Sequence, residues 1–438
     1  MQTFAFDELL DRRNLKPQYQ PIFDLVTHER IAAEALARWP DLGITPDSAF
    51  RWAAQEGRLA ELDETCADAA IDDAIAHGMP PRFQLFVNLE PSVLDPDTAT
   101  HLLSRADGQV GLVAEITERA LLDQPAELLR AIHHLRVAGC GIALDDVGAL
   151  PETLALLPFV APDVVKLDVS LVDRWPNVDQ AAIYTTVAAY AERAGATVLA
   201  EGIETDLRLQ RALALGATLG QGWALGSPGP LGAIFPPDHA LRLRQPVAPT
   251  PASPFSLVDP SAVRIGPKRL LLWISQHLEH QGLALETPPV VLGTFQHARN
   301  FTSETAHRYS RLGARCPLVA ALGAGMPSTP VQGVRGACLS AHDPLRSEWV
   351  IAVVGAHYAG ALIAHDLGDA GPDRDRRFAF TLTHDYVTVL AAARSLLERV
   401  TTVGRLPDLA MPGRYQRPLT TTDERSVQTP AGETRATT

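Results

Sequence analysis

Short apolar runs alternate with longer amphipathic segments along the first half of the chain. The longer segments, such as ELDETCADAAIDDAIAHG and QPAELLRAIHHLRVAGC, place apolar residues three or four positions apart and end in Gly, as helices often do. The short runs have the length of buried strands. We therefore predict strands over 17–25, 30–38, 83–90, 111–117, 141–146, 163–168, 197–204 and 219–227.

Eight strands that alternate with helices favour an α/β fold with a closed (β/α)₈ barrel. An open, doubly wound sheet is the competing prediction. It is disfavoured because no Gly-rich phosphate loop follows the first strand.

Proline-rich sequence divides the chain. The stretch QPVAPTPASPFSLVDPSA removes backbone donors and disfavours helix, so we predict a linker over 245–263. The barrel domain is then expected over 1–244 and a smaller α/β domain over 264–400. Residues 401–438 are poor in aliphatic side chains and are expected to form a disordered tail.

Composition narrows the classes of function. A chain of 438 residues suits two domains, and a net charge of −13 argues against a DNA-binding surface. The four cysteines form no CxxC pair, which disfavours a zinc cluster or a disulfide framework. No signal-peptide core or membrane-length apolar window is present, so we expect a cytoplasmic protein without a membrane partner.

Polar residues gather where the predicted strands end. In a (β/α)₈ barrel these ends share one mouth, and so many carboxylates cannot stay ionised together without divalent cations. Oxygen donors favour Mg²⁺ or Mn²⁺, and two adjacent aspartates could bridge two metals for displacement at phosphorus. The residues are Glu34, Asn88, Glu115, Asp145, Asp146, Lys166, Asp168, Glu201, Glu204 and Gln221.

Helix capping is the alternative role for individual residues of this set. Asp146, Asp168 and Thr205 could each cap the helix that follows. Lys166 is harder to explain in this way, since a buried amine needs an anionic partner. The set as a whole therefore favours a metal site.

Several motifs resemble one family in the same order. EALAR (34–38) is similar to the signature of the EAL family, the phosphodiesterases of the bacterial second messenger cyclic di-GMP. The likeness runs over residues 19–228 and rests also on YQPIFDL, VNLEPSVL, AEITERALL, LDDVG, VVKLDVSLV, AEGIET and QGWALGSP. It implies a TIM-like EAL barrel that hydrolyses cyclic di-GMP to linear pGpG with two divalent cations, Mg²⁺ or Mn²⁺.

The resemblance also implies roles for single residues. Asp145 would bridge the two metals, Lys166 would contact the attacking water or a phosphate oxygen, and Glu201 would act as general base. The implied metal ligands are Glu34, Asn88, Glu115, Asp145 and Asp146. The implied substrate-binding residues are Gln20, Leu36, Arg38, Asp168, Glu204, Gln221 and Pro228. Glu118 would steady the loop after the paired aspartates.

That loop departs from the family pattern. Where the family has DDFGTGYSSL, this chain reads DDVGALPETL, with Leu150 in place of a glycine and Pro151 in place of an aromatic residue. Leu disfavours a positive-φ turn and Pro removes a donor. Three hypotheses follow: an active phosphodiesterase, a cyclic di-GMP receptor with weak or no turnover, and a scaffold barrel that binds no nucleotide. The complete acidic set favours the first.

The second domain resembles the DICT domain, a sensory module found beside cyclic di-GMP enzymes. KRLLLWISQHLE, GTFQ and RFAFTLTHDYVTVLAAARSL carry this likeness. It implies that an unidentified signal or protein partner acts on the C-terminal domain and adjusts the barrel. The family's habit also implies a homodimer.

Overall fold

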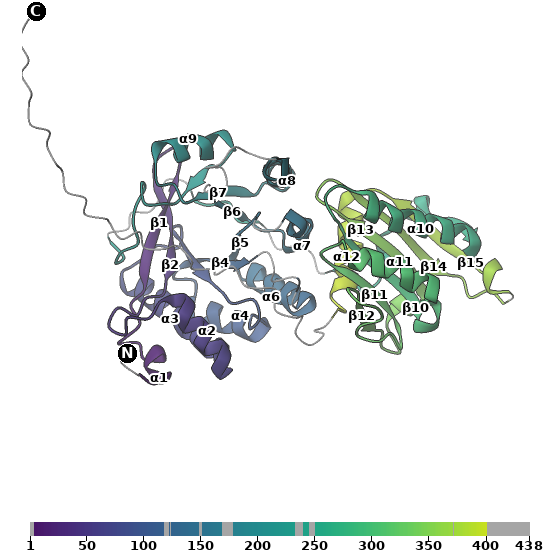
Figure 1. The fold of residues 1–438 in the computed structure, drawn as a ribbon, viewed down its shortest axis with the longest axis horizontal. Helices are drawn as coiled ribbons and strands as arrows, with labels where there is room; N and C mark the ends of the chain where they lie inside the picture. Colours follow the sequence, from purple (N-terminus) through teal and green to yellow (C-terminus); the bar gives the residue numbers. More distant parts are fainter. Residues whose placement is uncertain are drawn as a thin grey trace, which may run out of the picture.

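The computed structural model describes residues 4–117, 122, 124–148, 151–168, 178–232, 240–244, 250–370 and 372–400. These residues form two units side by side, a closed eight-stranded barrel and a domain built on a seven-stranded sheet (Figure 1). The α/β class and the barrel are therefore confirmed, and the open doubly wound sheet is excluded.

The barrel strands begin within one residue of their predicted starts, but the prediction of a strand over 219–227 was wrong in its extent, because β8 ends at Gly220. They are β1 Gln18–Asp24, β2 Arg30–Leu36, β3 Gln84–Asn88, β4 Gly111–Thr117, β5 Gly141–Asp145, β6 Val164–Asp168, β7 Thr197–Glu201 and β8 Leu219–Gly220. The helices between them are α2 Pro46–Glu56, α3 Leu59–Ala76, α4 Pro96–Ala106, α6 Pro125–Val137, α7 Leu157–Val160, α8 Val178–Ala194 and α9 Asp206–Ala214, and α1 Asp7–Leu10 precedes β1.

The first strand breaks the expected alternation of strand and helix. β1 runs antiparallel to both β2 and β8, whereas the strands from β2 to β8 pair in parallel. Only residues 25–29 separate β1 from β2, which is too short for the helical crossover that parallel strands require. The beginning of β1, not its end, therefore lies at the mouth, and Gln20 pairs with Glu34 of β2.

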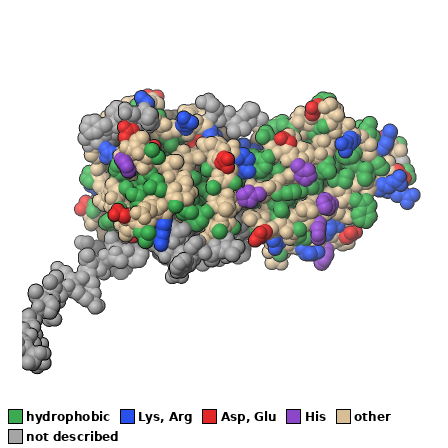
Figure 2. All heavy atoms as spheres, turned by 90° about the horizontal axis from the view of Figure 1, so that it is seen from above, with side chains coloured by type: hydrophobic (Ala, Val, Ile, Leu, Met, Phe, Trp, Pro, Cys, Tyr) green, Lys and Arg blue, Asp and Glu red, His purple; other side chains and the backbone are tan. Residues whose placement is uncertain are grey.

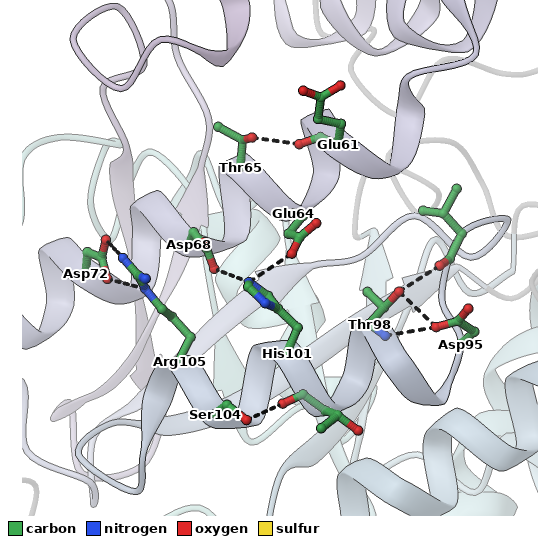
Figure 3. Close-up of polar contacts among 12 residues, drawn as sticks. Glu61, Glu64, Thr65, Asp68, Asp72, Asp95, Thr98, His101, Ser104 and Arg105 are labelled. Carbon is green, nitrogen blue, oxygen red and sulfur yellow. Dashed lines mark hydrogen bonds and ion pairs between the residues drawn. The ribbon is translucent and has the colours of Figure 1, made fainter.

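Polar pairs join the outer helices to one another. On α3 and α4, His101 Nε2 lies 3.1 Å from Glu64 Oε1 and 3.0 Å from Asp68 Oδ1, and Arg105 donates to Asp72 (Figure 3). Such exposed pairs contribute little to stability compared with the apolar core.

An apolar layer fills the barrel interior just below the mouth. It is formed by Ile22, Ala32, Phe86, Val113, Ala143, Val164, Leu199 and Leu219, all buried. Each lies two positions from a residue predicted for the site, and residues two apart on a strand face the same side. The predicted polar residues therefore also point into the barrel, and they form the layer between the apolar residues and the mouth.

The second domain has three layers. Its strands are β9 Arg264–Pro267, β10 Val290–His297, β11 Val319–Ala324, β12 Arg335–Cys338, β13 Glu348–Val354, β14 Ala359–Asp366 and β15 Arg377–Thr383, in the order β12-β11-β10-β13-β14-β15-β9. Alternate strand residues pack against different helices. Val290 and Leu292 share a cluster with α12 Tyr386–Leu397, whereas Val291 belongs with α10 Lys268–Ala284 and α11 Ser303–Gly313.

The predicted linker is partly packed on this domain. Two short 3₁₀ helices, Pro254–Leu257 and Pro260–Ala262, lie within it, and Phe255 N donates to Glu348 Oε2 at 3.1 Å. The domain limits stay predictions, and the predicted tail 401–438 lies outside the described residues. Apolar side chains spread over the face of the second domain that Figure 2 shows. The exposed apolar residues of this domain include Trp273 of α10 and Val387 of α12.

The part of the chain that the structure describes holds no helix with the length and apolar character needed to cross a bilayer.

A buried carboxylate at the bottom of the barrel offers a test of the fold. Asp163 is 1% exposed, accepts hydrogen bonds from the backbone of Ile142 and Arg244, and lies 3.3 Å from the Arg136 guanidinium. We expect Asp163→Ala to lower the free energy of unfolding by about 3–5 kcal/mol, because Arg136 would be left buried and unpaired. Urea denaturation followed by circular dichroism measures this.

The matched control is Asp72→Ala. Asp72 also pairs with arginines, Arg12 and Arg105, but its side chain is 34% exposed, so we expect a loss of about 0–1 kcal/mol. Equal losses in the two variants would contradict the interpretation of Asp163.

Candidate active site

A single ammonium group lies at the centre of the polar layer. Lys166 of β6 is 1% exposed, and its Nζ lies 2.7 Å from Glu201 Oε1 and 2.8 Å from Glu115 Oε1. It also lies 3.4 Å from Asp145 Oδ1 and 3.5 Å from Glu34 Oε2. Carboxylates from β2, β4, β5 and β7 therefore converge on one lysine, as the strand-end pattern predicts.

Amide side chains complete the layer. Gln221 Nε2 donates to Glu34 Oε2 at 2.7 Å and to Gln20 Oε1 at 3.0 Å. Asn88 Nδ2 donates to Glu34 Oε1 at 3.0 Å. Glu34 is thus held from both sides, and the structure brings together residues of β1, β2, β3 and the end of β8.

The paired aspartates separate at the end of β5. Asp146 has a positive φ of 57°, a conformation that Asp tolerates better than most residues, and its backbone N–H donates to Asp145 Oδ1 at 2.8 Å. Asp145 faces Lys166 while Asp146 is exposed. The turn therefore reduces the repulsion that two adjacent carboxylates would otherwise have.

Burial dominates the electrostatics of the layer. It raises the pKa of Glu115 well above its ordinary value, and the nearby Glu34 carboxylate adds to this rise. Burial also raises the pKa of Glu201 to about 8. For Lys166 burial opposes the charge, but the carboxylates of Asp145 and Glu115 outweigh it and raise its pKa. One ammonium thus faces four carboxyl groups in a poorly solvated site.

The donor set fits hard divalent cations. Glu115 Oε1 faces the Lys166 ammonium, whereas Glu115 Oε2 and Gln221 Oε1 are buried without a hydrogen-bond partner in the described residues. Carboxylate and amide oxygens suit Mg²⁺ or Mn²⁺. No group of three or more Asp, Glu, His or Cys side chains in the described ranges is already arranged around a metal-sized space, and Lys166 stands between the carboxylates instead.

Other predicted residues lie at the rim or make local contacts. Asp168 ends β6 and pairs with Glu201 of β7 in the sheet register. Arg38 Nη1 donates to Ala37 O at 2.9 Å, and Leu36 and Pro228 are half-buried. Glu204 is exposed and lies 2.8 Å from Arg208 Nη1. Glu118 and residues 149 and 150 of the atypical loop lie outside the described residues.

Capping is confirmed for one of the three residues considered for it. The Thr205 side chain accepts from Arg208 N at the start of α9. No helix in the described ranges begins directly after Asp146 or Asp168.

Two positions that support Gln221 escaped the sequence analysis. Ile203 N donates to Gln221 O at 3.1 Å, and a Cβ at Gly222 would lie 2.2 Å from Ile203 O. Only glycine permits this approach of two backbones. The glycine after Gln221 could have indicated a close backbone approach, but only the fold shows that the approaching residue is Ile203.

Comparison with protein families agrees with this geometry. Residues 5–228, more than half of the chain, match the family model described as EAL domain. The chain belongs to the EAL domain family. Residues 255–367 match the model described as sensory domain in diguanylate cyclases and two-component system, named DICT. The barrel is thus the EAL domain and the second unit contains the DICT domain.

Curated relatives share the EAL part. Cyclic di-GMP phosphodiesterase RocR of Pseudomonas aeruginosa is 29% identical over 238 residues, which cover 50% of this chain and 59% of RocR. Probable cyclic di-GMP phosphodiesterase PdeB of Escherichia coli is 30% identical over 228 residues, which cover 49% of this chain and 43% of PdeB. The chain therefore spans less than two thirds of either relative.

Solved structures that are similar include complexes with the nucleotide. The manganese and cyclic di-GMP complex of Klebsiella pneumoniae BlrP1 is 29% identical, with 49% of this chain and 56% of that chain covered and a TM-score of 0.45. The cyclic di-GMP complex of the PaMucR phosphodiesterase is 27% identical, with 51% and 95% covered and a TM-score of 0.45.

Divalent cations should stabilise the EAL domain. We expect Mg²⁺ or Mn²⁺ to raise the melting temperature measured by calorimetry, since a ligand at 100 times its Kd stabilises the native state by about 2.7 kcal/mol. Glu115→Gln should reduce this rise, because it removes a carboxylate charge from the layer. Glu192→Gln, an exposed change on α8, should keep it. An equal rise in both variants would show that the ions bind elsewhere.

Proposed function

We propose that this protein hydrolyses one phosphodiester bond of cyclic di-GMP and leaves linear pGpG. The observation that carries the proposal is the polar layer itself, in which Lys166 contacts the carboxyl groups of Glu201 and Glu115 within 2.8 Å at the mouth of an EAL barrel. Membership of the EAL family and relatives named as cyclic di-GMP phosphodiesterases support it.

Two divalent cations belong to this proposal. Glu34, Asn88, Glu115 and Asp145 would hold the first, and Asp145 with Asp146 would hold the second. When bound, the cations would lower the pKa of a water molecule and offset charge on the phosphate. The exposed position of Asp146 and the half-buried position of Asp145 give the two aspartates different reach from the end of β5.

Glu201 and Lys166 are the proposed catalytic residues. The Glu201 side chain is 23% exposed, so it can meet water at the mouth, whereas Glu115 is fully buried. Glu201 would accept the proton of the attacking water, and its 2.7 Å contact with Lys166 would hold the carboxylate in position. The ammonium would then face the phosphate oxygens.

The remaining predicted residues would shape the substrate cleft. Gln20 and Gln221 join each other and Glu34, so they would fix the floor beside the phosphate. Arg38 would pair with a substrate phosphate. The other proposed cleft residues are Leu36, Asp168, Glu204 and Pro228.

The second domain would regulate turnover, and the protein would act as a homodimer. Regulation is supported by direct contact, since Arg394 of α12 donates to Pro158 O at 2.9 Å and to Phe159 O at 2.7 Å on α7. α7 lies between β5, which ends in Asp145, and β6, which carries Lys166.

A cyclic di-GMP receptor with little or no turnover is the second candidate. Its support is the sequence after Asp146, in which VGALPE replaces the family's FGTGYS. Val147 is buried in the core at the start of this loop, where the family has a larger phenylalanine. A receptor would bind the nucleotide in the same cleft and signal through the second domain.

Turnover can be tested directly. With Mg²⁺ or Mn²⁺, we expect the purified protein to convert cyclic di-GMP to pGpG, measured by chromatography. Glu34→Ala should abolish the conversion, and Glu201→Gln should lower kcat by about 10²–10⁴-fold because it removes the base. Glu192→Gln is the control and should match the wild type. Tight binding in Ca²⁺ without turnover in Mg²⁺ or Mn²⁺ would overturn hydrolysis in favour of the receptor.

The loop can be tested by replacement. Changing residues 147–153 from VGALPET to FGTGYSS should raise kcat several-fold if the atypical loop limits the reaction, since a glycine at 150 permits a positive φ and residue 151 regains a backbone donor. Binding in Ca²⁺ should change little. An unchanged or lower kcat would show that the natural loop already supports turnover.

A further inference from the structure

A cavity lies where the second domain meets the barrel. α12 contacts α7, and α7 contacts α6, on the outer side of the barrel (Figure 1). Between them is a space of about 380 Å³ whose walls include Leu129, Ile132, Phe159 and Val160. It shares no lining residue with the candidate active site. Its volume lies within the range of small-molecule sites.

Guanidinium groups from both domains line this cavity. Arg130 and Arg136 come from α6, and Arg394 comes from α12. Arg136 is 4% exposed, and its Nη1 has no hydrogen-bond acceptor in the described part of the chain. The Nε of Arg394 is likewise buried without an acceptor there. Arg136 and Arg394 therefore each have a buried N–H group that could donate to a ligand.

Backbone carbonyls satisfy only part of this capacity. Arg136 donates to Ala161 O, and Arg394 donates to Pro158 O and Phe159 O. Arg244 donates to Ala161 O and Ala194 O beside them. Carbonyl oxygens are neutral, so they accept hydrogen bonds without cancelling the charge.

Carboxylates near the cavity do not balance the arginines. Asp163 pairs with Arg136 at 3.3 Å, and Glu127 pairs with Arg130 at 3.1 Å. Glu398 is a further acid on the cavity wall. Within the described part of the chain, four guanidinium groups at or beside the cavity, Arg244 included, face these three carboxylates. Burial lowers the pKa of Arg394 to about 10, with repulsion from Arg136 and Arg244 adding to the effect.

We propose that this cavity binds a small organic anion, an apolar ring or chain that carries a carboxylate or phosphate group. The anionic group would pair with Arg394, Arg136 and Arg130, and the apolar body would pack on Leu129, Ile132, Phe159 and Val160. Cationic donors beside apolar walls are the combination that such a ligand requires.

A ligand in this cavity would favour the docking of the second domain on the barrel. A ligand held by α6 and α12 together binds the docked arrangement of the domains better than a separated one, so it shifts the population toward docking. Docking places Arg394 on α7, which leads into the strand of Lys166. The binding claim itself goes beyond the proposed hydrolysis and does not depend on it.

Binding is tested on the full chain with defined probes. Benzoate and phenyl phosphate supply the anionic group on an apolar ring, and benzamide is the neutral counterpart of benzoate. Saturation-transfer difference NMR measures the Kd in EDTA, where the carboxylates of the active site repel anions. Sodium chloride keeps the ionic strength equal in every sample. We expect a Kd of about 1 mM or tighter for at least one anion and binding at least ~10-fold weaker for benzamide.

Matched variants locate the site. Arg394→Gln and Arg193→Gln each remove an arginine that crosses the domain junction, since Arg193 lies 4.2 Å from the Tyr386 ring, but only Arg394 lines the cavity. Arg394→Gln and Arg130→Gln should weaken anion binding at least ~10-fold, and Arg193→Gln should not. Leu129→Trp, which fills the cavity and keeps every arginine, should also abolish binding.

Three results would overturn the proposal. They are no binding of either anion at about 10 mM, ten times the expected Kd, equal binding of benzamide, or full binding in folded Leu129→Trp. The arginines would then act only as a structural clamp between the domains. Circular dichroism of each variant shows that it is folded.

Discussion

The ion pairs between Lys166 and the carboxyl groups around it are the interaction on which the rest of the EAL barrel depends. Glu115 and Lys166 are almost completely buried, and neither charge would be tolerated there without the other. The barrel must therefore close in the one register that brings β4, β6 and β7 around the same point. The same arrangement places four carboxyl groups around one ammonium group, which is why divalent cations belong to the proposed function.

This polar layer rests on an apolar layer that makes it rigid. Phe86, Val113 and Leu199 lie two residues before Asn88, Glu115 and Glu201 on their strands, so one set of packed side chains supports the other. The reversed β1 adds Gln20 from its beginning instead of its end. The hairpin of β1 and β2 closes the barrel against β8. Its Gln20 accepts a hydrogen bond from Gln221, which also donates to Glu34.

The second domain reaches the site through the connection between β5 and β6. α12 packs on its own sheet with one face and sends Arg394 to the carbonyl groups of α7. The connection that carries the atypical loop is thus also the one that the DICT-containing domain contacts. Loop chemistry and domain contact therefore act on the same short segment, between Asp145 and Lys166.

The sequence by itself predicted the strands, the barrel and the polar residues that the structure brings together around Lys166. Alternation of apolar runs with amphipathic helices is a local property, and the polar residues at the strand ends, such as Glu34, Asp145 and Glu201, follow from where each run stops. It did not determine the direction of β1, because strand pairing depends on a five-residue turn and on closure against β8.

Only the tertiary structure decided which side chains of the site contact one another. Lys166 contacts Glu201 and Glu115 more closely than Asp145, and Glu204 turns to Arg208, because distances between strands are set by barrel closure and not by spacing along the chain. The meeting of Arg136 with Arg394 likewise needs residues 258 positions apart, since 394 − 136 = 258, to share one cavity. No local pattern encodes such a contact, because it arises from the packing of one domain on another.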